Sequence, residues 1–348
     1  MAQIYGKRWK VQSSLNEGGQ AHTFLVTDVN ESTSSSYVLK RLKSLKRIDR
    51  FKREVDACLS LNHTNILKIE DKELESEPPY FVAEYCRGGA LSQSPILQRP
   101  LLQKLRLFGS ICEGVQHAHS QNIIHRDLKP DNIFLRDDLE PVVGDFGLCF
   151  VDEDGERVTM TDEQIGSRFY MAPELANGRT EDITPASDVY SLGKVLYWMI
   201  AGRIFDREVH RTEYFDLTKN QTAPDLFFVY ELLDKTIIEG PSKRLSNAGE
   251  LLNLVNKTIR LIEKKAHVLN LDTPQECNYC GLGFYKVIAD STSMNDRSGS
   301  TDVHNFGFTL VGMPQWLIMV CDHCGHVQIF RPDHVKSDNP WITKMSRH

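Results

Sequence analysis

Acidic, amide and lysine side chains recur in two short motifs of this 348-residue chain. Residues 125–132 read HRDLKPDN, and thirteen residues after Asn132 come Asp145, Phe146 and Gly147. Carboxylate and amide oxygens are the ligands that Mg²⁺ prefers, and a lysine supplies a point charge for phosphate oxygens. Such a set suits phosphoryl transfer from ATP, which needs its charge neutralised and two oxygens held in line.

Further motifs stand in a fixed order around these two. Val38-Leu39-Lys40 lies upstream, Glu54 follows in a basic helical run, and Met171-Ala172-Pro173-Glu174 lies downstream. One such motif would be weak, but all of them in this order and at workable spacings are strong. The chain resembles the eukaryotic-type (Hanks-type) serine/threonine protein kinases, with bacterial-like features, over roughly residues 5 to 265.

The resemblance implies an α+β, bilobal protein kinase fold for residues 1–265. The N-lobe, 1–85, would be rich in β-strands, and the C-lobe, 86–265, would be helical. The cofactors would be ATP and Mg²⁺ (or Mn²⁺), and the phosphate would go to Ser or Thr hydroxyls of protein substrates.

The family's catalytic positions match four residues of this chain. Lys40 would contact the α- and β-phosphates of ATP, and Glu54 would be its anionic partner. Asp127 would accept or orient the proton of the substrate hydroxyl. Lys129 would lie by the transferring phosphate, and a lysine there resembles serine/threonine rather than tyrosine kinases.

Asn132 and Asp145 match the family's two protein ligands of Mg²⁺. Arg126 directly precedes Asp127. In the family, this arrangement is found in kinases whose activity depends on an ordered activation loop. Each acidic residue alone could be a capping or surface carboxylate. For the whole set, the alternative is a pseudokinase scaffold that acts through its C-terminal module.

Residues 15–24 read LNEGGQAHTF and lie between two strand-like runs. Alone they predict a hairpin turn, but the resemblance makes them the glycine-rich phosphate loop. Gly18 is kept, whereas Asn16 and Ala21 replace the other two glycines, so we expect a functional but stiffer loop and weaker ATP binding. The expected nucleotide contacts in this loop are Leu15, Asn16, Gly18, Gly19, Ala21 and Thr23.

An apolar run ending at Val82 is followed by a candidate hinge. The family places adenine against backbone groups at positions that match Glu84 and Cys86. Ala83 occupies the position before the hinge, and a small residue there should open a back pocket beside the adenine.

Two matches further along the chain concern the scaffold. Asp188 matches the helix aspartate that braces the catalytic loop, and Arg244 matches the arginine that pairs with the glutamate of the APE motif, here Glu174. Small-molecule kinases of the aminoglycoside type share parts of the core but lack this set. A protein acceptor is therefore favoured, with a small-molecule acceptor as the alternative.

The segment from Asp145 to Glu174 corresponds to the activation segment. Thr159 and Thr161 have a spacing similar to the paired threonines that bacterial receptor-type kinases autophosphorylate, and Ser167 stands in the usual threonine position. Phosphate there could pair with Arg126 and a basic helix. Alternatively, the threonines only decorate a flexible loop.

Apolar periodicity predicts the helices that must position these residues. The clearest runs are 49–61, 102–120, 187–201 and 246–265. In the first run, the apolar face consists of Phe51, Val55, Cys58 and Leu59. Its opposite face is basic, which indicates either a solvated surface or a docking surface for a phosphorylated loop.

Four cysteines form two C-x-x-C pairs near the end of the chain. They are Cys277, Cys280, Cys321 and Cys324. A glycine follows each pair and strand-like runs flank them, so the pattern resembles a zinc ribbon with a closed, structural Zn²⁺ site. The redox alternative needs a thioredoxin-like βαβ context, which the sequence does not show.

The expected boundaries are a linker at 266–276, a small β zinc-ribbon domain at 277–335 and a tail at 336–348. The polar stretch 289–305 is expected to be a mobile loop. From Glu263 onward, eight Lys or Arg stand against nine Asp or Glu. This near-neutral balance favours docking on the kinase or a partner protein over nucleic acid.

The composition is that of an ordinary packed protein, with 41% hydrophobic and 25% charged residues. The net charge of −6 gives no electrostatic case for binding bulk nucleic acid or anionic membranes. The first residues contain no apolar signal region, and no apolar stretch is long enough to span a membrane. We therefore expect a cytoplasmic protein.

Overall fold

The computed structural model describes most of the first 264 residues and the strands of the C-terminal region. The described residues are 3–16, 21–31, 35–136, 140–146, 168–176, 183–217, 226–264, 269–270, 275–276, 284–290, 300–303, 308–311, 317–321, 323–324, 327–330 and 335–336. Two units are present, Met1–Arg260 and Leu261–His348.

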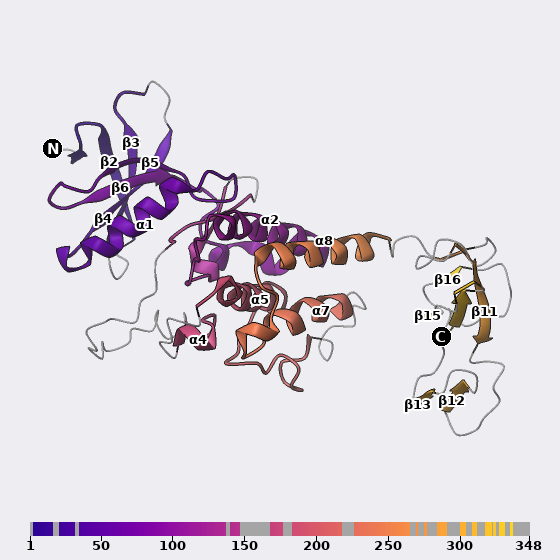
Figure 1. The fold of residues 1–348 in the computed structure, drawn as a ribbon. Helices are drawn as coiled ribbons and strands as arrows, with labels where there is room; N and C mark the ends of the chain where they lie inside the picture. The colour runs from indigo at the N-terminus through magenta and orange to yellow at the C-terminus, as the bar shows by residue number, and fades with distance from the viewer. Residues whose placement is uncertain are drawn as a thin grey trace. The chain divides into compact units, whose positions relative to one another are not determined.

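A six-stranded antiparallel sheet forms the first part of unit 1 (Figure 1). Its strands are β1 (Ile4–Tyr5), β2 (Trp9–Asn16), β3 (Ala21–Asp28), β4 (Ser36–Leu42), β5 (Ile69–Glu73) and β6 (Tyr80–Glu84), in the order β1-β2-β3-β4-β6-β5. Side chains of Trp9, Val26, Leu39 and Val82 are fully buried on one face and form its core. An antiparallel sheet with one buried face directs alternate residues of each strand toward the core.

Helix α1 (Ile48–Ser60) lies along this sheet (Figure 1) and matches the helix predicted at 49–61. Phe51, Val55 and Cys58 are buried, as their spacing predicts. Leu59 is 45% exposed, so its assignment to the apolar face was wrong. Glu54 lies on the inner side of this helix, is 9% exposed and faces the candidate site.

Helices dominate the second part of unit 1. They are α2 (Leu101–Ser120), α4 (Pro173–Ala176), α5 (Pro185–Ala201), α7 (Leu226–Thr236) and α8 (Ala248–Lys264), with the short strands β7 (Ile133–Leu135) and β8 (Pro141–Val143). Short 3₁₀ turns are η1 (Leu45–Arg47), η2 (Leu91–Gln93), η3 (Pro95–Gln98), η4 (Pro130–Asn132) and η6 (Pro241–Lys243). The runs predicted at 102–120, 187–201 and 246–265 are therefore confirmed within two residues.

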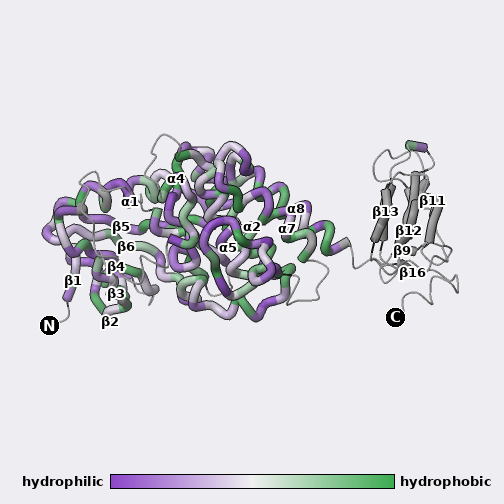
Figure 2. The backbone as a smooth tube through the Cα atoms, turned by 90° about the horizontal axis from the view of Figure 1, so that it is seen from below, coloured by the Kyte–Doolittle hydropathy of each residue, from purple (hydrophilic) through white to green (hydrophobic). Residues whose placement is uncertain are grey.

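Helix α5 is the buried centre of this helical lobe, and α2 and α7 pack against it. It begins at Pro185 and ends before Gly202, whose φ of 68° is left-handed, the usual asymmetry of helix ends. A Cβ on Gly193 would lie 2.2 Å from Oγ1 of Thr236, so only glycine lets α5 and α7 approach this closely. In contrast, the tube of α8 alternates between hydrophobic and hydrophilic residues, as an amphipathic surface helix should (Figure 2).

Lys194, near the middle of α5, is a lysine with no exposed surface. Its Nζ donates hydrogen bonds to the carbonyls of Phe205 (2.7 Å) and Arg207 (2.8 Å) and lies 3.9 Å from the centroid of the Phe205 ring. Burial lowers the pKa of Lys194 to about 7. The amine thus anchors the segment that follows α5 from inside the lobe.

This pKa predicts how stability changes with pH. Between about pH 7 and pH 10 the unfolded chain carries more protons at Lys194 than the folded chain, so stability rises with pH by up to about 1.4 kcal/mol per unit. We expect this rise in wild type and its absence in Lys194→Met. Urea unfolding at pH 6.5, 8 and 9.5 measures it, with exposed Lys235→Met as the control. Parallel pH profiles for wild type and Lys194→Met would contradict the assignment.

Unit 2 contains strands next to both C-x-x-C pairs, as the sequence predicts, and others besides. A four-stranded antiparallel sheet has the order β10-β11-β14-β15, formed by β10 (Gln275–Glu276), β11 (Phe284–Asp290), β14 (Leu317–Cys321) and β15 (Val327–Phe330). Separate pairs are β12 (Ser300–Val303) with β13 (Phe308–Val311), and β9 (Leu269–Asn270) with β16 (Val335–Lys336).

Two sequence expectations for this region need correction. The stretch 289–305, expected to be a loop, contributes the end of β11 and all of β12, because the mostly polar residues Ser300–Val303 pair with the mostly apolar β13. The expected linker 266–276 likewise contains β9 and β10. Short polar strands have no periodicity of their own, so only their partners reveal them.

None of the helices in the described part of the chain is both long enough and apolar enough to cross a membrane.

Candidate active site

Lys40 lies on β4 and reaches two carboxylates at the junction between the sheet and the helical lobe. Its Nζ is 2.8 Å from Oε1 of Glu54 on α1 and 2.8 Å from Oδ1 of Asp145, which follows β8. The three residues lie far apart in the sequence. The structure therefore brings together the lysine, its expected partner and the aspartate of the second motif.

The charges of this group support one another. Burial alone would lower the pKa of Lys40, but the charges of Asp145 and Glu54 outweigh it and raise that pKa above its ordinary value. Burial alone would raise the pKa of Asp145, but Lys40 outweighs it and the pKa is lowered. At neutral pH the lysine is a cation and the aspartate is an anion that can bind another cation.

A second group surrounds Asp127. Nδ2 of Asn132 donates to the backbone carbonyl (2.7 Å) and to Oδ2 (2.9 Å) of Asp127, and Nζ of Lys129 lies 3.2 Å from the same Oδ2. Asn132 uses its amide nitrogen in these bonds, so the amide oxygen is the atom that suits a cation.

Backbone and imidazole hydrogen bonds hold the two groups side by side. The amide of Gly144 donates to the carbonyl of Asn132 at 2.9 Å. Nδ1 of His125 accepts from the amide of Asp127 at 3.2 Å, and Nε2 is 2.9 Å from the carbonyl of Gly144. Both bonds form when His125 is the neutral tautomer with its proton on Nε2. The ring of Phe146 packs against the His125 ring, with 4.6 Å between the two ring centroids.

Asp188, which has no exposed surface, fixes the start of the 125–132 segment from α5. Its carboxylate accepts from the amides of His125 and Arg126, each at 2.8 Å. The φ of Arg126 is 68°, a left-handed conformation that needs such support. Burial alone would raise the pKa of Asp188, but hydrogen bonds, with His119 first, lower it.

The expected hinge begins at the end of β6, where hydrogen bonds hold the carboxylate of Glu84. Glu84 accepts a bidentate pair of hydrogen bonds from Arg136, at 2.8 Å and 2.9 Å, and one from the amide of Lys68 at 3.1 Å. Ala83 and Cys86 are buried, and burial raises the pKa of the Cys86 thiol to about 12. Burial of Ala83 and Cys86 and the hydrogen bonds of Glu84 thus hold these three side chains in place.

The strands on either side of the expected phosphate loop are paired. Strands β2 and β3 pair antiparallel, with Asn16 opposite Thr23, and Leu15 lies on β2 with 40% exposure. Asn16 and Ala21 belong to strands, and Ala21 is buried. Gly18 and Gly19 lie outside the described residues.

The scaffold pair predicted at Glu174 and Arg244 is present and buried. Nη1 and Nη2 of Arg244 lie 2.6 Å and 2.9 Å from the two carboxylate oxygens of Glu174. Burial alone would raise the pKa of Glu174, but the hydrogen bonds from Arg244 and Ser187 outweigh it and lower that pKa.

Comparison with known proteins decides the family. Residues 9–264 match the protein kinase domain family. The chain belongs to the protein kinase family. Its bilobal fold is accordingly the kinase fold, with the β-sheet lobe before the hinge and the helical lobe after it.

Three curated relatives of this kinase domain carry related names. The chain is 33% identical over 207 residues to the serine/threonine-protein kinase PrkC of Bacillus subtilis, covering 58% of this chain and 32% of that one. It is 31% identical over 204 residues to PknB of Mycobacterium leprae, covering 56% and 32%. A probable serine/threonine-protein kinase of Corynebacterium efficiens is 27% identical over 300 residues, covering 79% and 45%.

The chain thus spans 32% to 45% of the length of these curated relatives.

Several predicted sites of the chain lie outside the described residues. These are Thr159, Thr161, Ser167, Cys277 and Cys280. Cys321 ends β14, and Cys324 lies in an exposed turn just after it. Among the described residues, no three His, Cys, Asp or Glu side chains gather as a metal site would need.

Two contributors to the kinase domain's site carry no sequence signal. His119 Nε2 lies 2.8 Å from Oδ2 of Asp188, and its Nδ1 accepts from the amide of Ala248 at 3.2 Å. Arg136 holds the hinge glutamate. Each depends on contacts between distant segments, so spacing along the chain cannot reveal it.

Proposed function

We propose that this chain is an ATP-dependent serine/threonine protein kinase. The observation that carries the proposal is the position of Lys40 between Glu54 and Asp145, beside the group formed by Asp127 and Asn132. Most lysines lie on the surface with their ammonium group in water, whereas Lys40 is held between two carboxylates at the lobe junction. The names of the relatives point the same way.

The donor set suits ATP and a divalent cation. The carboxylate of Asp145 and the amide oxygen of Asn132 would hold Mg²⁺ or Mn²⁺, and Lys40 would bind phosphate oxygens. When bound, Mg·ATP supplies the phosphoryl group and the cation that neutralises its charge. We further propose that the hinge at Glu84 and Cys86 binds adenine through its backbone, below the loop containing Leu15, Asn16, Gly18, Gly19, Ala21 and Thr23.

Asp127 is the residue that would handle the proton. Its carboxylate is kept in place by Asn132 and Lys129, so it can orient a substrate hydroxyl and accept its proton. Lys129 lies 3.2 Å from this carboxylate, where its ammonium group would lie near the transferred phosphate as well.

The kind of hydroxyl that accepts the phosphate can be measured directly. After incubation with ATP and Mg²⁺ or Mn²⁺, acid hydrolysis of the phosphorylated protein should yield phosphoserine and phosphothreonine. Phosphotyrosine alone would contradict the proposal. A metabolite screen in which a small molecule, and no protein, takes the phosphate would favour the small-molecule alternative.

Ala83 gives a prediction about inhibitors. Ala83 is buried, and its methyl group would leave room beside the adenine that a phenylalanine would fill. Inhibitors with a bulky group on an adenine-like ring should inhibit wild type and lose at least about tenfold in potency against Ala83→Phe. Dose–response curves at the KM for ATP measure this. Equal inhibition of both proteins would refute the placement of Ala83.

Regulation by phosphorylation is a further part of the proposal. We propose that Thr159, Thr161 and Ser167 take up phosphate by autophosphorylation and that Arg126 and the basic side of α1 receive it. Part of that side is already paired, since Lys52 lies 2.7 Å from Glu75. Mass spectrometry of active enzyme that finds no phosphate on these residues would refute this idea.

We also propose a structural zinc site in a ribbon formed by 277–335, and strand register supports it. Glu276 at the end of β10 pairs with Phe284, and Cys321 at the end of β14 pairs with Tyr285. Strands β10 and β14, at whose C-terminal ends the two C-x-x-C pairs begin, therefore end on the same side of the sheet, opposite the start of β11. Four thiolates, from Cys277, Cys280, Cys321 and Cys324, would fill a tetrahedral site and leave no open position for catalysis.

Zinc content tests this site. We expect about one zinc per chain by elemental analysis of purified protein, in line with one four-cysteine site. Cys321→Ser should lose the metal, while the buried Cys112→Ser should keep it. Zinc-free wild type that shows unchanged protease resistance in residues 277–335 would contradict the proposal.

The net charge supports a proposal about the location and the partners of the protein. With a net charge of −6, we propose a cytoplasmic chain that uses no nucleic-acid or membrane partner, and whose ribbon docks on the kinase domain or on a partner protein.

A further inference from the structure

Two histidine rings from different lobes stack on each other. His63 lies in the connection between α1 and β5, and its ring meets that of His117 on α2. The ring centroids are 5.1 Å apart and the ring planes differ by 28°. Both side chains are half-buried. The pair therefore joins the connection that follows α1 to a helix of the other lobe.

The ring of His63 also holds the shape of its own connection. Its Nδ1 accepts a hydrogen bond from the amide of Asn65, two residues further on, at 3.0 Å. A ring nitrogen accepts such a bond only when it carries no proton, so His63 is the neutral tautomer with its proton on Nε2. A proton on Nδ1 turns this acceptor into a donor, and the amide of Asn65 then loses its partner.

Asn65 links this hydrogen bond to β8. Its Nδ2 donates to the carbonyl of Pro141 at 2.8 Å, and its own carbonyl accepts from the amide of Val143 at 2.9 Å. The side chain of Asn65 is buried, and a Cβ on Gly114 of α2 would lie 2.6 Å from its carbonyl oxygen. Because Asn65 is packed this tightly, a shift of its backbone displaces the strand that leads to Asp145.

The surroundings of His63 oppose a second proton on its ring. Burial has the largest effect and lowers the pKa of His63, and the neighbouring His117 lowers it further. Glu113, one turn before His117 on α2, acts in the opposite direction but does not outweigh them. The neutral ring is therefore the form that the fold favours at neutral pH.

Arg136 is the charged side chain that faces this connection from the segment after β7. Its Nη1 donates to the carbonyl of Thr64 at 2.9 Å. Glu84 and Glu140 lie 2.8 Å and 3.4 Å from its guanidinium group. Carboxylates with ordinary pKa values stay ionised above about pH 5, so this group keeps its charge while a histidine titrates.

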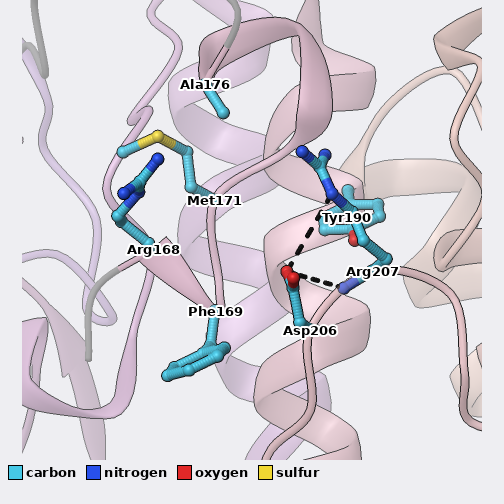
Figure 3. A pocket seen from close by; sticks show the side chains of 7 residues that line it. All are labelled: Arg168, Phe169, Met171, Ala176, Tyr190, Asp206 and Arg207. Atoms are coloured by element: carbon cyan, nitrogen blue, oxygen red, sulfur yellow. Dashed lines mark hydrogen bonds and ion pairs between the residues drawn. The ribbon is translucent and has the colours of Figure 1, made fainter. Parts of the chain in front are cut away.

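The cavity in Figure 3 is a separate feature of the helical lobe. Its walls come from α4 and the segment before it, from Tyr190 of α5, and from Asp206 and Arg207. Neither histidine of the pair lines this cavity. Substitutions at the pair therefore leave the residues of its walls unchanged.

We propose that His63 is a positioning residue that makes the kinase sensitive to acid, because its neutral ring holds Asn65 and β8 in place and a proton on Nδ1 releases them. The inference rests on the proposed kinase activity and adds a form of regulation to it. Acid breaks the bond to Asn65 and places a cation against the ring of His117. The strand that leads to Asp145 then loses a support, and phosphoryl transfer slows.

Two substitutions separate the hydrogen bond of His63 from its titration. Asparagine can accept from the amide two residues further on, as the Asp28 carboxylate accepts from the amide of Asn30 at 2.8 Å, and it takes up no proton. Alanine neither accepts the bond nor titrates. His63→Asn therefore keeps the bond at every pH, whereas His63→Ala lacks it at every pH.

The measured quantity is the rate of transfer to a protein acceptor at pH 7.5 divided by the rate at pH 5.0, with saturating ATP and Mg²⁺. We expect this ratio to be at least about fivefold larger for wild type than for His63→Asn, since one hydrogen bond contributes about this much. Acid effects on Asp127 and on ATP are common to both proteins and cancel. His63→Ala should already be slower than wild type at pH 7.5, by at least about threefold, and should share the small ratio of His63→Asn.

The titration of the ring is a readout that a merely structural role would not link to activity. Nuclear magnetic resonance of ¹⁵N-labelled histidine gives the pKa of His63, which should coincide with the acid midpoint of wild-type activity. His117→Gln removes the neighbouring ring and exposes His63 to water. It should therefore raise this pKa and the activity midpoint together.

Two results would overturn the inference. One is an equal ratio in wild type and His63→Asn, with thermal unfolding showing that the variant is folded. The other is an activity midpoint that stays in place when His117→Gln moves the pKa of His63. The absence of transfer by wild type at pH 7.5 would instead overturn the proposed function, and with it the regulation that depends on it.

Discussion

Asp127→Asn should reduce phosphoryl transfer to protein by about 10²- to 10⁴-fold, which is the contribution of a positioned general base. An asparagine has the size and shape of the aspartate, and its amide oxygen can still accept the bonds from Asn132 and Lys129. It cannot take up a proton from a hydroxyl group. The fold and ATP binding should therefore be kept, and only the transfer step should be lost.

Asp131→Asn is the matched control for this prediction. Asp131 lies four residues further along the same segment and accepts a hydrogen bond from Oγ of Ser92 at 2.7 Å. It undergoes the same change of charge, yet transfer should stay within about threefold of wild type. Initial rates at saturating ATP measure both variants, and thermal unfolding shows that both are folded. Equal losses in the two variants would show that charge, and not proton transfer, explains the effect.

Arg244→Met should lower the free energy of unfolding of the kinase domain by about 3–5 kcal/mol, because it leaves a buried carboxylate without its partner. The guanidinium of Arg244 has no exposed surface. Besides Glu174 it donates to the carbonyls of Ile238 (2.5 Å), Glu239 (2.6 Å) and Ala186 (3.2 Å), so it joins α4, the start of α5 and the segment after α7. A methionine fills the volume but satisfies none of these acceptors.

A double-mutant cycle separates the ion pair from the other bonds of Arg244. Adding Glu174→Gln to Arg244→Met removes the stranded charge, so the double variant should be less destabilised than the sum of the two single variants. Urea unfolding provides the free energies. Arg211→Met, which breaks an exposed pair with Asp234, is the control and should cost no more than about 1 kcal/mol. Additive losses at Glu174 and Arg244 would contradict the interpretation.

Acid should weaken the same pair. The pKa of Glu174 is lowered in the folded chain, so its contribution to stability is complete above its ordinary pKa of about 4.3 and is lost as the pH falls through the lowered value.

Periodicity along the sequence was enough to find the long helices and the order of the motifs. Helix α5, for example, is rich in apolar residues and begins at a proline, and its predicted start at Ser187 lies two residues from the observed one. The motifs were enough to expect a pairing between Lys40 and Glu54 and between Glu174 and Arg244, because the family resemblance links positions that are far apart in the chain.

Contacts that depend on folding could not be found in this way. His119 braces Asp188 from the end of α2, and nothing in its sequence neighbourhood distinguishes it from His117, two residues earlier. Leu59 fits the apolar spacing of α1 but is exposed, because the inner face of that helix is turned to bring Glu54 toward Lys40. Strand β12 is polar and is formed only by pairing with β13.

Transfer of labelled γ-phosphate from ATP to protein tests the central claim most directly. Wild type, incubated with Mg²⁺ or Mn²⁺, should label itself or a generic protein acceptor on serine or threonine. The Asp127→Asn variant should show a signal lower by at least about 10²-fold. The absence of transfer by wild type with either metal would contradict the account and favour a pseudokinase scaffold.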